Sequence, residues 1–299
     1  MTQPLLAPAK VNLFLHVVGR RDDGYHVLDS LVAFAGVGDL LRFEAADSLT
    51  LTVEGPQAAV LAGEADNIVL KAARRLAEAG GVAPRAAIYL DKRLPVASGI
   101  GGGSADAAAA LRGLSRLWGV SLTEEAMGEL ALGLGADVPV CLYGRPASMG
   151  GIGERLDPAP SLPPAWLVLV NPGRPLSTPA VFRRRAEMFP GGRFSRAAPL
   201  AEPPADAVAL ALALSLRGND LMAAAISVEP EVDAVLRAIS ATEDCLLARM
   251  SGSGATCFGL FASPDSAGAA ARRLEAAHPG WWVAAARLLD DATAASPPD

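Results

Sequence analysis

The sequence has few of the residues that stabilise small secreted proteins or form zinc sites. It contains three cysteines in 299 residues, and they lie far apart without CxxC spacing. A disulfide framework or a zinc site needs a paired pattern, so neither is expected. We predict that Cys141, Cys245 and Cys257 are buried free thiols, as in a reducing compartment.

Long apolar runs and basic clusters are also lacking. No stretch approaches the ~18 unbroken apolar residues of a membrane span. The N-terminus has no basic segment followed by an apolar run, as a signal peptide would. The net charge is −6, and the longest basic run, Arg183 to Arg185, is more typical of a solvated helix face than of a phosphate-binding surface. We expect a cytoplasmic protein that binds neither membrane nor nucleic acid.

Aromatic residues make up only 5% of the chain, whereas hydrophobic residues as a whole reach 51%. This composition predicts aliphatic, helix-rich cores, and the length allows two domains. Residues 157–164 contain four prolines and form the best candidate linker. We expect domains over residues 1–156 and 157–291, followed by a disordered tail over 292–299.

The densest motif is a glycine loop, with four glycines between Gly99 and Gly103. An alanine-rich helix follows to about Leu117, opened by Ser104. Glycine lets backbone N–H groups approach a ligand closely, and the first N–H groups of a helix are unpaired at the positive end of its dipole. The loop therefore predicts a phosphate site; a flexible surface turn is the alternative. It lacks the Gly-Lys-Ser/Thr ending of a Walker A loop and the third glycine of a dinucleotide fingerprint.

Three further positions carry side chains suited to a site. Lys10 and Asn12 share one face of a predicted strand over residues 5–19, and this stretch alone favours a solvated face over a site. Tyr25 and His26 precede a strand over 27–34 and suit either ring stacking on a ligand or half-buried packing. Asp137 lies between a glycine turn and an apolar segment that we predict to be a strand; it is either a cap or a functional carboxylate. Asp106 is expected to cap the helix after the glycine loop.

Local patterns predict the remaining elements. An N-cap at Asp66-Asn67 begins a helix that ends near Ala79. Strands are predicted over 40–43, 48–53, 86–90, 166–170, 246–250, 255–261 and 281–288. Helices are predicted over 121–134 and 264–277, and from about 177, 205, 220 and 229.

Three motifs together resemble a known superfamily. Pro95-x-x-x-Gly99-Ile100-Gly101-Gly102-Gly103-Ser104-Ala105 is similar to the ATP-binding motif of the galactokinase, homoserine kinase, mevalonate kinase and phosphomevalonate kinase (GHMP) superfamily. Residues 7–13 and 251–256 resemble its N-terminal and C-terminal motifs. Within it, residues 10–15, 21–26, 135–139, 171–173 and 177–179 resemble the 4-diphosphocytidyl-2-C-methyl-D-erythritol kinase family. Asp106 stands where asparagine is also common.

The resemblance implies an α+β fold of two domains with the active site between them. The N-terminal domain would be ATP-binding and ribosomal-protein-S5-domain-2-like, and the C-terminal substrate domain would be a ferredoxin-like α/β domain. It further implies an ATP- and Mg²⁺-dependent kinase that phosphorylates the 2-hydroxyl of 4-diphosphocytidyl-2-C-methyl-D-erythritol in non-mevalonate isoprenoid biosynthesis, as a monomer or weak homodimer. Two alternatives remain: a sister kinase acting on homoserine, mevalonate or a sugar, and a nucleotide-binding regulator without catalysis.

The resemblance also assigns roles to residues. Asp137 would be the general base, and Lys10 would stabilise the developing charge beside it. Tyr25, His26 and Phe182 would enclose the cytosine, while Asn12 and Thr178 would contact other parts of the substrate. Asn67 and Lys92 would border the adenine. No metal ligand is assigned, although Ser104 suits phosphate or Mg²⁺. The loop expected to hold ATP comprises Pro95, Val96, Ala97, Ser98, Gly99, Ile100, Gly101, Gly102, Gly103, Ser104 and Ala105.

Overall fold

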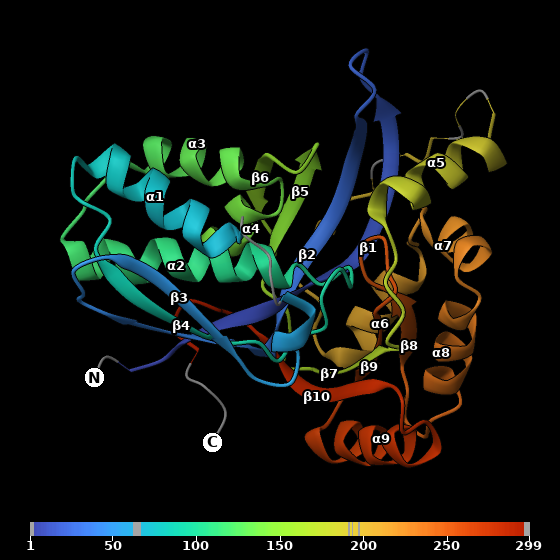
Figure 1. Ribbon diagram of the computed structural model, residues 1–299. Coiled ribbons are helices and arrows are strands. Elements are labelled where there is room, and N and C mark those ends of the chain that lie inside the picture. Colours follow the sequence, from blue (N-terminus) through green and yellow to red (C-terminus); the bar gives the residue numbers. More distant parts are fainter. Residues whose placement is uncertain (1–2, 62–66, 191, 193, 197, 296–299) are drawn as a thin grey trace.

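A computed structural model gives the fold for residues 3–61, 67–190, 192, 194–196 and 198–295 (Figure 1). The strands are β1 (Leu5–Arg20), β2 (His26–Glu44), β3 (Leu49–Glu54), β4 (Ala86–Asp91), β5 (Ala147–Gly151), β6 (Arg155–Pro158), β7 (Trp166–Asn171), β8 (Leu247–Met250), β9 (Cys257–Phe261) and β10 (Trp282–Leu289). The helices are α1 (Ile68–Gly80), α2 (Gly102–Trp118), α3 (Glu124–Leu134), α4 (Val138–Tyr143), α5 (Thr178–Met188), α6 (Ala207–Ser215), α7 (Met222–Val228), α8 (Glu231–Ser240) and α9 (Pro264–Ala277), with a 3₁₀ turn at Ala58–Leu61.

One sheet runs through both halves of the molecule, in the order β3-β4-β2-β10-β7-β9-β8. β1 forms a long antiparallel hairpin with β2, and β5 and β6 continue from β2. The two halves meet where Leu288 and Leu289 of β10 pair with Ala35 and Phe34 of β2. Helices α1, α2 and α3 cover the N-terminal part, and α5 to α9 surround the C-terminal strands (Figure 1). This is the mixed α+β architecture that the family resemblance implies.

Three buried clusters hold these layers together. The first lies between α1, α2 and the N-terminal strands and is rich in alanine, from Ala105 to Ala110 in particular. The second joins β1 and β2 to β7 and β9, and the third lies beneath α5, α7, α8 and α9. Phe14 and Phe258 belong to the second cluster, which therefore fixes the strand carrying Lys10 and Asn12 against the C-terminal half.

Most predicted elements are confirmed because their start and stop signals are local. Asn67 caps α1 by accepting a hydrogen bond from the backbone N–H of Val69, and Gly81 ends it in the left-handed conformation. Its predicted partner Asp66 lies outside the described residues. Thr123 and Ser263 cap α3 and α9 in the same way. Among the described helices, none combines the length and apolar character that a membrane crossing requires.

One predicted strand is wrong, and two others are joined into one. Residues 138–143 form the short helix α4, with Pro139 in its first turn and Gly144 as its C-cap, because so short an apolar run has no periodicity that separates helix from strand. The strands predicted over 27–34 and 40–43 are one strand, β2, because a register shift opposite Pro8 and Ala9 accommodates the intervening residues without a turn.

Three smaller expectations also change. Helix α2 begins at Gly102 rather than Ser104, which places Asp106 beyond its first turn. Arg185 is buried although Arg183 and Arg184 are exposed. At the start of the predicted disordered tail, Ala292 is buried and its N–H donates to the Gly144 carbonyl at 2.7 Å. Residues 296–299 lie outside the described part of the chain.

Of the cysteines, Cys141 and Cys257 are buried free thiols as predicted, and Cys245 is half-buried. Burial in apolar surroundings raises the pKa of the Cys141 thiol to about 12. These cysteines therefore behave as packing residues rather than as nucleophiles.

Candidate active site

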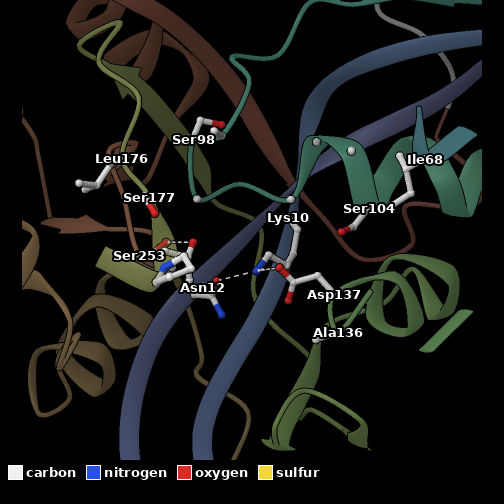
Figure 2. A pocket seen from close by; sticks show the side chains of 18 of the residues that line it. Lys10, Asn12, Ile68, Ser98, Ser104, Ala136, Asp137, Leu176, Ser177 and Ser253 are labelled. Atoms are coloured by element: carbon white, nitrogen blue, oxygen red, sulfur yellow. Dashed lines mark hydrogen bonds and ion pairs between the residues drawn. The ribbon is translucent and has the colours of Figure 1, made fainter. Parts of the chain in front are cut away.

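A cavity of about 1320 Å³ lies where the two halves meet. Its walls come from β1, the glycine loop, the start of α2, Asp137 and, on the opposite side, Ser177, Thr178 and Ser253 (Figure 2). A volume above 1000 Å³ exceeds that of a typical pocket for one drug-sized ligand. The cavity therefore has room for two ligands side by side.

Lys10 and Asp137 meet in this cavity although 127 positions separate them in the sequence. The Nζ of Lys10 donates to Oδ2 of Asp137 at 2.9 Å and to Oδ1 of Asn12 at 2.9 Å (Figure 2). The Lys10 side chain is 4% exposed, whereas that of Asp137 is 34% exposed. The face of β1 that carries Lys10 and Asn12 is therefore buried against a site, and the solvated-face alternative is wrong.

Asp137 is the residue before α4, but its side chain does not cap that helix. The carboxylate instead points to Lys10, and Asp137 lines the cavity (Figure 2). Of the two roles considered for this carboxylate, the structure removes the capping one.

The glycine loop binds the rest of the protein through its carbonyl oxygens. Those of Ser98, Gly99 and Ile100 accept hydrogen bonds from Thr256 N–H at 3.0 Å, Ser251 Oγ at 3.0 Å and Lys10 N–H at 2.9 Å. Because a trans peptide places C=O and N–H on opposite sides, the N–H groups that follow them face the other way. The first N–H groups of α2 have no partner within the helix. The loop thus presents donors to an anion, as its sequence predicts.

Gly99 and Gly101 are required by the path of this loop. Both have positive φ values, +79° and +63°, and Gly101 is the N-cap of α2. A Cβ at position 99 would lie 2.6 Å from the Ser251 carbonyl oxygen. Only glycine therefore allows the glycine loop to approach the loop over residues 251–254 this closely.

Lys92 lines the cavity, and two buried aspartates hold its ammonium group. Its Nζ donates at 2.6 Å both to Oδ2 of Asp39 and to Oδ2 of Asp106, and all three side chains are buried. Burial raises the pKa of Asp106 to about 8, against the opposing effect of Lys92, and Oδ1 of Asp106 has no hydrogen-bond partner among the described residues. The carboxylate of Asp106 therefore binds Lys92 and does not cap the helix.

Aromatic side chains line the part of the cavity next to the turn between β1 and β2. The rings of His26 and Phe182 stack with centroids 4.7 Å apart, and Tyr25 is 61% exposed at the cavity edge. Burial lowers the pKa of His26, and the positive charges of Arg185 and Arg20 lower it further. The neutral ring is therefore favoured. The side-chain oxygens of Thr178 and Ser253 lie 2.7 Å apart on the neighbouring wall.

The structure brings most predicted site residues to one cavity, but Ile100 and Ala105 are buried in the hydrophobic clusters and are absent from the described residues that line it. Asn67 lines the cavity, but its Oδ1 is already bound to the Val69 N–H at 2.9 Å. Sequence reasoning missed Asp39. Its Oδ2 binds Lys92, and its Oδ1 accepts hydrogen bonds from the backbone N–H groups of Arg93 and Leu94. A carboxylate within an apolar strand needs a partner, and that signal could have identified it.

Comparisons with known proteins agree with this architecture. The family description "GHMP kinases N terminal domain" matches residues 67–145, and "GHMP kinases C terminal" matches residues 202–280. The chain is similar to the 4-diphosphocytidyl-2-C-methyl-D-erythritol kinase of Paramagnetospirillum magneticum, with 64% identity over 95% of this chain and 97% of that protein. It is 57% identical to the protein of the same name from Rhodospirillum rubrum, over 95% of this chain and 92% of that protein.

A solved structure gives the same result. The crystal structure of a 4-(cytidine 5'-diphospho)-2C-methyl-D-erythritol kinase aligns with a TM-score of 0.78 and 37% identity. The alignment covers 96% of this chain and 99% of that one. The likeness therefore extends over both halves of the molecule and the cavity between them.

Proposed function

The chain belongs to the 4-diphosphocytidyl-2-C-methyl-D-erythritol kinase family of the GHMP kinases, and we propose that it transfers the γ-phosphoryl group of ATP to the 2-hydroxyl of 4-diphosphocytidyl-2-C-methyl-D-erythritol. The observation that carries the catalytic assignment is the 2.9 Å contact between Lys10 and Asp137 at the wall of the cavity. In this proposal the acceptor hydroxyl would meet the donor beside this base and this cation.

Asp137 is the general base in this proposal. The substrate hydroxyl gives its proton to the carboxylate as its oxygen bonds to the γ-phosphorus, and the bond from that phosphorus to the bridging oxygen of ADP breaks. Lys10 holds the carboxylate in place and stabilises negative charge on the transferring group. Phosphoryl transfer depends on positioning and charge more than on covalent help, so two groups on rigid elements suffice.

The glycine loop and the N-terminus of α2 would hold the ATP phosphates. Kinases of this superfamily use ATP, and the free N–H groups of residues 102–104 suit its charge. The oxygen donors at this end, Ser104 Oγ and Asp137 Oδ1, are of the hard type that Mg²⁺ prefers, and both residues line the cavity. No group of three or more His, Cys, Asp or Glu that could hold a metal exists among the described residues. Mg²⁺ bound to the ATP phosphates would neutralise their charge there.

The aromatic end of the cavity would receive the cytosine. A neutral His26 stacked on Phe182 offers a flat apolar face together with a ring nitrogen for hydrogen bonding. Tyr25 stands at the edge, where its ring can cover the base. Thr178 and Asn12 also line the cavity, so they would contact the rest of the substrate.

Replacement of Asp137 by asparagine tests the catalytic assignment. The change keeps the shape of the side chain but removes its basicity, so we expect kcat to fall by about 10²–10⁴-fold. ADP release should be followed with ATP and the cytidine-linked substrate, and folding by thermal unfolding. Asp157→Asn, at an exposed ion pair outside the cavity, is the matched control and should keep wild-type kcat.

Two results would contradict the proposal. Normal turnover by folded Asp137→Asn would exclude Asp137 as the base. Wild-type turnover of homoserine or mevalonate, with none of the cytidine-linked compound, would exclude the substrate.

A further inference from the structure

The amide of Asn12 has two ends, and only one arrangement suits its neighbours. Its Oδ1 accepts from Lys10 Nζ at 2.9 Å, while its Nδ2 donates to Ser30 Oγ at 2.8 Å. If the amide were rotated by half a turn, its NH₂ group would face the ammonium of Lys10, donor against donor. The orientation of this amide therefore decides whether Lys10 is held.

Ser30 determines that orientation through its single hydrogen. The hydroxyl of Ser30 donates to the carbonyl oxygen of Phe14 at 2.5 Å. A hydroxyl has one hydrogen, so toward Asn12 its oxygen acts as acceptor only. The NH₂ end of Asn12 must then face Ser30, and the oxygen end must face Lys10.

The local fold sets up this contact. β1 and β2 shift register between Asn12 and Phe14, so that Ser30 lies opposite Leu15. Such a shift changes where a strand's polar groups point, which fits the bonding of the Phe14 carbonyl to a side chain. Ser30 is fully buried and is absent from the described residues that line the cavity. It therefore reaches the site only through Asn12.

We propose that Ser30 is a positioning residue for phosphoryl transfer, because it fixes the Asn12 amide so that its oxygen holds Lys10 against Asp137. This inference rests on the proposed function. A series of hydrogen bonds then runs from the Phe14 carbonyl through Ser30 and Asn12 to Lys10 and Asp137. The third N–H of Lys10 is left for the transferring group.

A double-mutant cycle between Ser30 and Asn12 tests this role. Ser30→Ala leaves the buried Asn12 NH₂ without an acceptor, so we expect kcat to fall about tenfold, with the KM for ATP unchanged. In an Asn12→Ala background the same change should alter the single-turnover rate less than about twofold, since the residue through which Ser30 acts is gone. Ser30→Thr keeps the hydroxyl and should keep kcat within about threefold of wild type.

The controls separate this role from a merely structural one. Thermal unfolding of each variant shows whether it is folded. If Ser30→Ala does not fold, Ser30→Cys retains most of the volume with only a weak acceptor, and it should show the same loss and the same dependence on Asn12.

The inference is overturned if the folded Ser30 variant has wild-type kcat, or if its loss is equally large in the Asn12→Ala background. Asp137→Asn, measured in the same assay, distinguishes the two levels. If it abolishes turnover while Ser30→Ala has no effect, only the role of Ser30 fails; if it turns over normally, the proposed function itself fails.

Discussion

Two buried lysines bind aspartates in this protein, and their surroundings differ in one decisive respect. Lys10 contacts Asp137, a carboxylate with a 34% exposed side chain that opens on the cavity. Lys92 lies between Asp39 and Asp106, whose side chains are 0% and 3% exposed. Asp137 of the first pair can exchange protons and meet ligands, whereas Lys92 and Asp106, although they also line the cavity, are almost fully buried.

The difference shows how burial of both partners separates a structural ion pair from a reactive one. A charge that is buried on every side must be balanced by fixed partners, and removing one partner leaves the others uncompensated. A carboxylate that reaches solvent loses little when its partner is removed. Lys92 should therefore matter mainly for stability, and Lys10 mainly for turnover.

The largest effect is expected from Lys92→Met. It leaves Asp39 and Asp106 buried without their cation, so the free energy of unfolding should fall by about 3–5 kcal/mol. Urea denaturation measures this loss. If the variant has wild-type stability, the interpretation of Lys92 as a structural cation is wrong.

Lys10→Met should show the opposite pattern. We expect kcat to fall about a hundredfold, equivalent to roughly 2.7 kcal/mol, because charge on the transferring group loses its nearest cation. The free energy of unfolding should change by less than about 1 kcal/mol, since Asp137 remains partly solvated. Steady-state kinetics and the same denaturation experiment provide the measurements. A large loss of stability with unchanged kcat would remove the contrast between the two lysines.

Asp106→Asn should change how stability depends on pH. The pKa of Asp106 is raised to about 8 in the fold, whereas an unfolded aspartate has a pKa of about 3.9. The folded state thus holds an extra proton between these values, and its stability falls as pH rises through them. Asparagine removes this dependence, which is at most about 1.4 kcal/mol per pH unit for one proton. Parallel stability curves of wild type and variant from pH 5 to 8 would contradict the assignment.

Much of the fold could be predicted because its signals are short in range. The caps at Asn67, Thr123 and Ser263 and the alternation around Lys10 each act within a few residues. The strand predicted over 138–143 failed because six apolar residues carry no decisive period, and Pro139 and Gly144 favoured a helix. The site residues were assigned through a family resemblance, because spacing alone left solvated-face and capping alternatives open for Lys10 and Asp137.

The glycine loop, the helix that follows it and the N–H groups that it offers to an anion can be predicted from the residues alone, because φ preferences and unpaired helix ends are local properties. Which lysine meets an accessible carboxylate depends on tertiary packing. Lys10 and Asp137 are 127 residues apart, and Lys92 and Asp39 are 53 residues apart. Which of these pairs remains open depends on the packing of β1, α2 and α4, and no local pattern encodes it.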